Sequence, residues 1–259
     1  MTSLTLYLLS AAGYAVAAAL FQRNNEGRAW THARVLLLVS LACHTTGIVA
    51  KAIEEPHSPF SSVGKTAPLV AWFLIVLYLI VGWRANMEIL GTFAAPSAML
   101  LMLAAAAADR QPGTPAQWSY WREIHVIAIF FGVAAFTLAA FCAIIYYRES
   151  QALKRKKLPP SSIPSLEKLD RWSHHLIVIG FPSLGVGWLA GSIGRGVLWS
   201  GTAAEYFTLA TMILYAAYIH VRLISGWQGL RVNLLLIVGS VLLLVTYVGV
   251  SFLPSGFHP

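Results

Sequence analysis

The feature that most constrains this chain is its series of long apolar stretches, each long enough to cross a membrane as a helix. A bilayer core of about 30 Å needs about 20 apolar residues per helix. Lipid offers exposed backbone no hydrogen-bond partners, so such stretches cross as helices. We therefore predict an all-α, polytopic membrane helix bundle with eight transmembrane helices, forming one domain over residues 1–259. The expected spans are approximately 4–21, 33–53, 67–83, 91–108, 124–147, 174–194, 203–222 and 232–253.

Composition excludes the main alternatives to a membrane protein. Only 11% of the residues are charged and 58% are hydrophobic, whereas a soluble domain carries roughly 25% charged residues. This excludes a soluble enzyme, a disordered chain and a disulfide-rich secreted module. The two cysteines, Cys43 and Cys142, lie in apolar runs without C-x-x-C spacing, which argues against thiol redox chemistry and covalent haem attachment.

The basic residues predict the orientation of the bundle. The loop 148–173 contains Lys154, Arg155, Lys156 and Lys157, and Lys and Arg accumulate in cytoplasmic loops. With that loop inside, alternation places 13 of the 18 Lys and Arg residues inside and both termini outside. The net charge of +8 is thereby explained by the bilayer, and no nucleic-acid partner is expected. We expect a multi-pass protein of the bacterial cytoplasmic (inner) membrane.

The first apolar stretch also resembles a signal peptide in its position. It has no basic residue before it, since the first positive charge, Arg23, follows the apolar run. A signal peptide begins with a positively charged segment. We therefore expect a retained helix with its N-terminus outside.

Four histidines stand out against this topology. An ionisable side chain within the hydrocarbon costs a few kcal/mol, so an embedded histidine needs a reason. His44 lies near the middle of the second span, with Ser40 and Gly47 on its helical face, and His220 lies in the inner part of the seventh span. His125 opens the fifth span and His258 follows the eighth, which places both at the outer surface.

Paired imidazoles across an apolar cleft suit a b-type haem, because each neutral nitrogen donates to one axial position of the iron. Cations near the haem then meet its two propionates, and flat aromatic side chains can line its edge. The candidates for the outer propionates are Arg122 and Arg195, those for the inner propionates are Arg222 and Arg34, and the aromatic candidates are Trp118, Trp121, Trp188 and Trp199.

Structural interpretations of the same residues stay open. Tryptophan near a membrane boundary is often only an interfacial anchor, and a histidine at a span end is often only solvated. His44 can be explained by a hydrogen bond to a neighbouring helix. After His125, the row Ala128, Gly132, Ala135 and Ala139 suits either close helix packing or a flat ligand. We expect the remaining four histidines to be solvated: His32, His57, His174 and His175.

Several local sequences resemble one known family. The segments PSLEKLDR, LYAAYIHVR followed by GWQG, and TYVGVSFLPSGFHP are similar to the cytochrome c assembly family, which contains the CcsA/ResC haem-handling proteins and shorter HemX-like relatives. WREIHVIAIFFGVAAF resembles the region around that family's first external histidine. The resemblance implies that His125 and His258 are the external pair. It also implies that His220 is the second membrane-embedded histidine and that His44, by its position in the second span, is the first.

One segment departs from the family pattern. Haem exporters of the family carry a segment resembling W-G-x-x-W-x-W-D-P-K-E, whereas this chain reads GRGVLWSGTAAE, which retains Trp199 and Glu205. The aromatic platform that presents haem to an apocytochrome is therefore degraded. This implies the HemX-like branch, whose members are associated with haem biosynthesis, including the level of glutamyl-tRNA reductase.

We therefore predict an integral membrane protein, not an enzyme, that binds haem b and acts in haem handling or in regulating haem biosynthesis. Its expected partners are haem, the lipid bilayer and a cytoplasmic haem-biosynthesis enzyme. One alternative is a haem exporter that delivers haem to apocytochrome c with a membrane or periplasmic partner. Another is a membrane scaffold without a cofactor.

Overall fold

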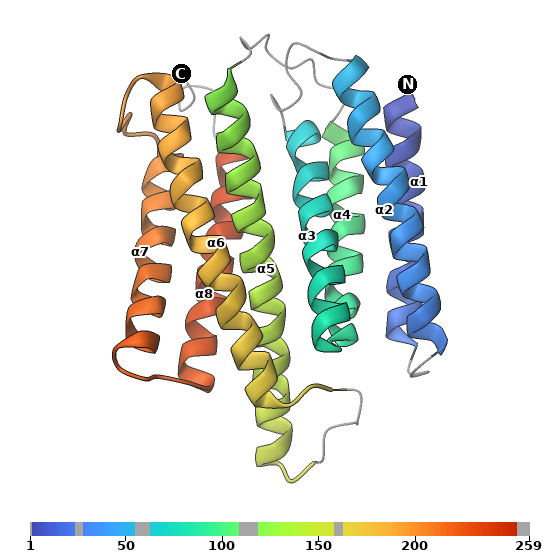
Figure 1. Cartoon of the computed structure of the whole chain (residues 1–259), viewed down its shortest axis with the longest axis vertical. Helices are drawn as coiled ribbons and strands as arrows, with labels where there is room; N and C mark the ends of the chain where they lie inside the picture. Colours follow the sequence, from blue (N-terminus) through green and yellow to red (C-terminus); the bar gives the residue numbers. More distant parts are fainter. Residues whose placement is uncertain (1, 24–27, 55–62, 109–118, 158–162, 253–259) are drawn as a thin grey trace. The chain divides into compact units, whose positions relative to one another are not determined.

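The computed structural model describes residues 2–23, 28–54, 63–108, 119–157 and 163–252. All regular structure within these residues is helical (Figure 1). The elements are α1 (Thr2–Gln22), α2 (Arg28–Glu54), α3 (Val63–Ala85), the short 3-10 helix η1 (Glu88–Leu90), α4 (Gly91–Ala108), α5 (Tyr120–Lys154), α6 (Leu166–Arg195), α7 (Ala203–Leu223) and α8 (Leu230–Phe252).

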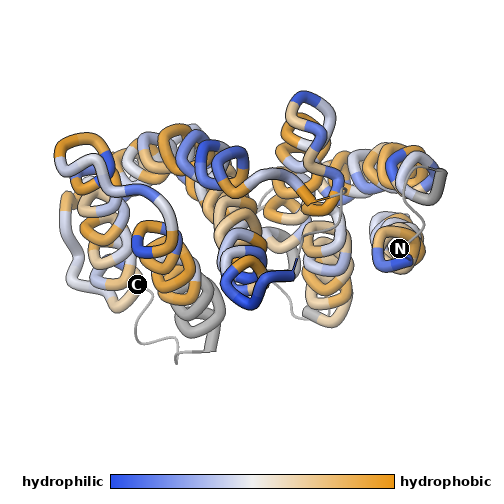
Figure 2. Tube along the Cα trace, turned by 90° about the horizontal axis from the view of Figure 1, so that it is seen from below, coloured by the Kyte–Doolittle hydropathy of each residue, from blue (hydrophilic) through white to orange (hydrophobic). Residues whose placement is uncertain are grey.

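Seven of these helices, α1 to α7, are long and apolar enough to cross a membrane. Figure 2, which looks along the helices, shows hydrophobic residues within the helices and hydrophilic residues at several of the helix ends that face the viewer. The predicted eighth span coincides in position with α8, whose apolar part with described side chains is the shorter Leu230–Leu243. The eighth crossing and the orientation with both termini outside stay predictions.

Two helices, α5 and α6, exceed their predicted spans by the largest margins. The fifth span was expected over 124–147, but α5 has 35 residues and is therefore about 50 Å long at 1.5 Å per residue. The sixth was expected from 174, but α6 already begins at Leu166 because Ser165 caps it: the Ser165 hydroxyl accepts a hydrogen bond from the Lys168 backbone N at 3.3 Å. Counting apolar residues misses helical turns that carry charges.

The chain divides into two compact units, unit 1 up to Phe130 and unit 2 from Phe131. In unit 1, α1 packs against both α2 and α4, and α4 also packs against α3. Tyr14, Leu37, Tyr78 and Met102 are fully buried there. Contacts between α2 and α3 are sparser.

Glycine lets α1 and α2 approach closely. A Cβ atom at Gly13 would lie 2.0 Å from Ser40 Oγ and 3.1 Å from Ser40 Cβ. Ser40 Oγ is itself held by the backbone oxygen of Leu36 at 2.7 Å. A side chain at Gly13 therefore requires Ser40 Oγ to leave its hydrogen bond with Leu36 or the two helices to separate.

We expect Gly13→Ala to lower the free energy of unfolding in detergent by about 1–3 kcal/mol, the usual cost of overpacking. Gly185→Ala is the matched control, because the nearest atom to its added Cβ is Met212 Cε at 4.0 Å. Thermal unfolding followed by circular dichroism compares the two variants. Equal stability of Gly13→Ala and Gly185→Ala would contradict the close approach of α1 to α2. Adding Ser40→Ala to Gly13→Ala should restore part of the lost free energy of unfolding.

Unit 2 is centred on an aromatic stack that joins three helices. Phe136 of α5 stacks on Tyr215 of α7 with ring centroids 4.0 Å apart and an interplanar angle of 22°. The Tyr215 hydroxyl lies 3.4 Å from Ser240 Oγ of α8. Ser240 Oγ donates to the Leu236 backbone oxygen at 2.9 Å and lies 3.5 Å from the Phe136 backbone oxygen. These contacts fix the rotation of α7, and hence which of its residues face outward.

Candidate functional site

His44 of α2 lies in the interior of unit 1. Its side chain is 0% exposed, and its Nδ1 lies 3.0 Å from the Tyr14 hydroxyl of α1. Tyr7 and Tyr14 are seven residues apart, which places them on one helical face, and their rings meet the imidazole edge-on at centroid distances of 6.0 and 5.9 Å. The backbone of Pro68 in α3 also interacts with the imidazole. The predicted alternative of a hydrogen bond to a neighbouring helix is therefore present.

The other ring nitrogen of His44 is unusual. Nε2 is buried and has no hydrogen-bond partner among the described residues. It is a donor or an acceptor according to the tautomer. The ring is nevertheless enclosed by aromatic side chains and the backbone of α3. The residues present around His44 therefore do not fit a porphyrin, because neither ring nitrogen is accessible.

His220 has the opposite environment. It is exposed near the C-terminal end of α7, and Ala216 and Ala217 beside it are exposed as well. The buried side of α7 carries Tyr215 and Tyr218, whose packing turns His220 outward. An accessible imidazole next to small side chains leaves room for a flat ligand, so this position fits an axial haem ligand.

His125 lies half-buried in the second turn of α5, within unit 1. Trp121 and Arg122, one turn earlier, are exposed. His258, the other predicted external histidine, lies outside the described residues. The pairing of His125 with His258 therefore stays a prediction.

The row of small residues that follows His125 packs helices together once it enters unit 2. A Cβ at Gly132 would lie 3.1 Å from the Gly180 backbone oxygen of α6, and a Cβ at Gly180 would lie 3.1 Å from Ala135 Cβ. Ala135 and Ala139 are fully buried. Of the two interpretations of this row, close helix packing is confirmed from Gly132 onward.

The segment between α6 and α7 is organised by Glu205. Its carboxylate accepts hydrogen bonds from Ser200 N at 2.8 Å and Ser200 Oγ at 2.9 Å, and it pairs with Arg195 Nη2 at 2.7 Å. Glu205 also forms a capping box with Thr202 at the start of α7. The retained Glu205 therefore builds a compact turn, while Arg195 keeps 39% of its side chain exposed.

The turn also presents Trp199. Its ring meets Tyr206 edge-on at a centroid distance of 5.1 Å, and the indole remains partly exposed. Trp199 and Arg195 are therefore both accessible at the same end of unit 2. The arrangement can offer an aromatic face and a fixed cation to an anionic ligand.

A buried polar cluster in unit 2 was missed by the sequence analysis. Asp170 of α6 pairs with Arg222 Nη2 of α7 at 2.7 Å and accepts from Asn233 Nδ2 of α8 at 2.8 Å. The three side chains are almost entirely buried. They join three helix ends, and both charges suit the helix dipoles, because Asp170 lies near the start of α6 and Arg222 in the last turn of α7.

Polar atoms around this ion pair remain unsatisfied. Tyr218 Oη, His174 Nδ1 and Arg222 Nη1 are buried and lack hydrogen-bond partners among the described residues. The Tyr218 and His174 rings lie 6.1 Å apart between centroids. His174 was expected to be solvated, and its buried Nδ1 differs from that expectation. Such atoms suit a buried water or a polar ligand.

Comparison with known proteins identifies a matching family and several similar proteins that share one name. The sequence model of the family described as Cytochrome C assembly protein matches residues 29–258. A protein of Welwitschia mirabilis named cytochrome c biogenesis protein CcsA is 28% identical over 250 residues, covering 83% of this chain and 82% of its own length. A protein of the same name from Prochlorococcus marinus (strain MIT 9303) is 29% identical, covering 86% and 83%. One from Chlamydomonas reinhardtii is 26% identical, covering 87% and 67%.

Proposed function

Because the chain belongs to the cytochrome c assembly protein family, we propose that it is a membrane protein that binds haem through histidines and handles it during cytochrome c biogenesis. The observation that carries this proposal is the outward-facing His220 beside the exposed Ala216 and Ala217. This position combines an accessible nitrogen ligand with room for a flat ring. The family match includes the position of every predicted haem ligand.

The ligand set that we propose consists of His220 on α7 and the external pair His125 and His258. Haem supplies an iron with two axial positions and two anionic propionates. His44 is left out of this set, because Tyr7 and Tyr14 enclose its ring. Its predicted role as a ligand stays an untested prediction.

Neighbouring residues are proposed to position the propionates and the edge of the haem. Glu205 fixes Arg195 through one nitrogen while the guanidinium stays partly exposed, so its remaining N–H groups can meet a carboxylate. Arg122 and Trp121 are exposed one turn before His125 and can contact a ligand bound by that histidine. Asp170 already pairs with Arg222, so contact between Arg222 and a propionate would use the Nη1 group that lacks a partner.

A second candidate function is regulation of haem biosynthesis, as in the HemX-like branch. The segment GRGVLWSGTAAE favours it, because the tryptophan-rich and acidic core of the exporters is replaced by a capped turn centred on Glu205. A haem-biosynthesis enzyme would then be the cytoplasmic partner. A periplasmic or membrane biogenesis partner is expected for the first candidate.

Haem titration tests the proposal. Purified protein in mild detergent is titrated with haemin, and absorption spectra are recorded with and without dithionite. The wild type should show a Soret band of a histidine-ligated haem b. His220→Ala should weaken or shift that band. The double variant His125→Ala with His258→Ala should weaken or shift the band of a haem bound at the external pair. His175→Ala is the control, since His175 is exposed on α6 outside the proposed ligand set. A wild type that takes up no haemin would support the scaffold without a cofactor.

A cellular measurement separates the two candidate functions. Deleting the gene should abolish covalent cytochrome c if the protein acts in cytochrome c biogenesis. If it regulates haem biosynthesis, the level of glutamyl-tRNA reductase should change while cytochrome c maturation persists. Location in a bacterial cytoplasmic membrane stays a proposal, because the matched relatives come from Welwitschia as well as from Prochlorococcus.

A further inference from the structure

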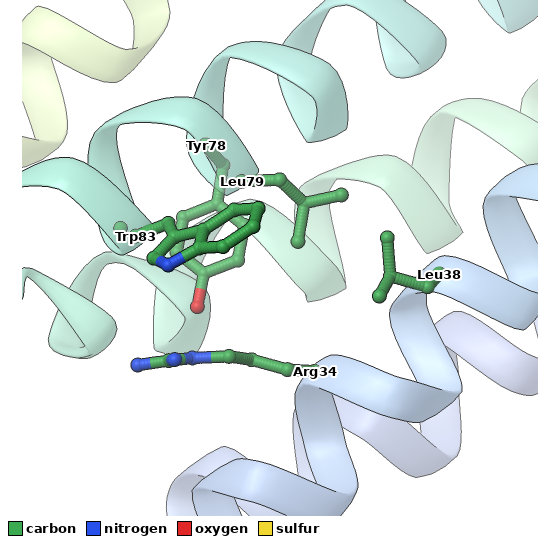
Figure 3. A pocket seen from close by; sticks show the side chains of 6 residues that line it. Arg34, Leu38, Tyr78, Leu79 and Trp83 are labelled. Atoms are coloured by element: carbon green, nitrogen blue, oxygen red, sulfur yellow. The ribbon is translucent and has the colours of Figure 1, made fainter.

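A groove of ≈ 220 Å³ lies between α2 and α3 in unit 1. Figure 3 shows that α2 provides Arg34 and Leu38, while α3 provides the remaining side chains that face them. The residues that line the groove are Arg34, Leu38, Tyr78, Leu79, Gly82 and Trp83. The walls of the groove are apolar except for the Arg34 guanidinium, the Tyr78 hydroxyl and the indole N–H of Trp83.

The groove opens on the outside of the helices. Trp83 is 81% exposed and Leu38 is 55% exposed. Because α2 and α3 are candidate membrane spans, such apolar side chains face lipid when the protein is in a bilayer. Enclosed sites for drug-sized ligands are typically about 300–1,000 Å³. A smaller open groove suits part of a molecule whose remainder stays in the surrounding bilayer.

The polar end of the groove is held in place. Arg34 Nη2 forms an ion pair with Glu88 of η1, and the Tyr78 hydroxyl donates to the Glu88 backbone oxygen at 3.4 Å. A guanidinium has five N–H donors, so the pair with Glu88 leaves others for a second anion. Arg84, the residue after Trp83, is exposed at the same end of α3.

We propose that this groove binds an anionic phospholipid of the surrounding bilayer. The phosphate lies at Arg34, and one acyl chain runs along Leu38, Leu79 and Trp83. Basic sites between transmembrane helices bind anionic lipid headgroups, and tryptophan with arginine marks the level of the headgroups. None of the proposed histidine ligands lines the groove, although Arg34 was predicted as a candidate for the inner propionates, and the lipid proposal does not depend on the proposed function.

Glu88 makes the proposal testable against a purely structural role for the ion pair. If Arg34 and Glu88 only brace the fold, Arg34→Gln and Glu88→Gln act in the same direction. If Arg34 binds a lipid phosphate, Glu88→Gln removes the competing anion and maintains or strengthens lipid binding, whereas Arg34→Gln weakens it. Gly82→Leu fills the groove without changing charge, since the Cβ position at Gly82 is in ordinary contact with the Tyr78 ring at 3.4 Å.

The experiment uses the full chain in detergent with phosphatidylglycerol or phosphatidylcholine of identical chains, and native mass spectrometry counts the bound lipid. The wild type should prefer phosphatidylglycerol about fivefold, which is the roughly 1 kcal/mol that one basic residue contributes near an anionic surface. Arg34→Gln should remove that preference, and Gly82→Leu should reduce binding of both lipids. Arg171→Gln, an exposed cation of α6 in unit 2, is the control and should bind as the wild type does.

Three results would overturn the proposal. The first is equal binding of the two lipids by the wild type. The second is an equal loss of phosphatidylglycerol in Arg34→Gln and Glu88→Gln. The third is loss of the haemin band in Arg34→Gln with lipid preference unchanged, which would assign the groove to haem. Arg34→Gln alone can unfold, because it leaves the Glu88 charge unpaired. The double variant Arg34→Gln with Glu88→Gln removes both charges of the pair. Loss of the preference for phosphatidylglycerol in this double variant supports the proposal.

Discussion

Replacing Asp170 with leucine is expected to lower the free energy of unfolding by about 3–5 kcal/mol, the usual cost of removing one partner from a buried ion pair. The variant leaves the Arg222 charge almost fully buried without its carboxylate, which lies 2.7 Å away in the wild type. It also removes the acceptor for Asn233 Nδ2 at 2.8 Å. Because the cluster joins α6, α7 and α8, the loss should affect all three helices.

The control is Glu167→Gln, one turn earlier on α6. Glu167 pairs with Arg171 at 4.0 Å with both side chains exposed, and exposed pairs contribute only about 0–1 kcal/mol. Unfolding in detergent, by heat or by increasing sodium dodecyl sulfate, compares the variants. The double variant Asp170→Leu with Arg222→Met should recover much of the loss, because it removes the uncompensated charge. Similar losses for Asp170→Leu and Glu167→Gln would show that the cluster is not a buried ion pair.

The Asp170 cluster could not be predicted from apolar runs. Expecting the sixth span to begin at residue 174 assigned Asp170 to a loop and left Arg222 without a carboxylate partner. The helix begins at Leu166 because Ser165 caps it, so Asp170 is already inside α6. Residues 165–168 read S-L-E-K, with the capping serine directly before the helix, so the sequence carries a local signal for the helix start that counting apolar residues does not use.

Other features followed directly from the sequence. The requirement that lipid-exposed backbone be hydrogen-bonded internally makes long apolar runs helical, and α1 to α7 meet the length and composition of membrane spans. Small residues on one face of α5 suited either close helix packing or a flat ligand, and the contact of Gly132 with Gly180 provides close packing. Rotation about each helix axis was harder to predict, because it depends on partners such as Tyr215 for Phe136. That rotation decides that His220 faces outward and His44 inward.

His44 is the residue for which the family resemblance and the structure lead to different expectations. As an axial ligand it would control the haem spectrum. As a buried imidazole at 3.0 Å from the Tyr14 hydroxyl it would instead control the stability of unit 1. The two roles differ in their measurable effects, because a structural residue can be lost without a change in ligation.

From the enclosed geometry we expect His44→Ala to lower the free energy of unfolding by about 2–4 kcal/mol, since it leaves a cavity and an unpaired Tyr14 hydroxyl. Tyr14→Phe should cost less, about 0.5–1.5 kcal/mol, because it removes one hydrogen bond but keeps the packing. The double variant should cost less than the sum of the two single losses, because both remove the same contact. Thermal unfolding measures these losses in the absence of haemin.

The haemin spectrum provides the second half of this test. If His44 is structural, folded His44→Ala at low temperature should keep the wild-type Soret band, and Tyr14→Phe should keep it as well. A band that is lost in His44→Ala but kept in Tyr14→Phe, with stability unchanged in both, would instead assign His44 as an iron ligand. In that case unit 1 must open around Tyr7 and Tyr14 to admit the porphyrin, because their rings flank the imidazole at 6.0 and 5.9 Å.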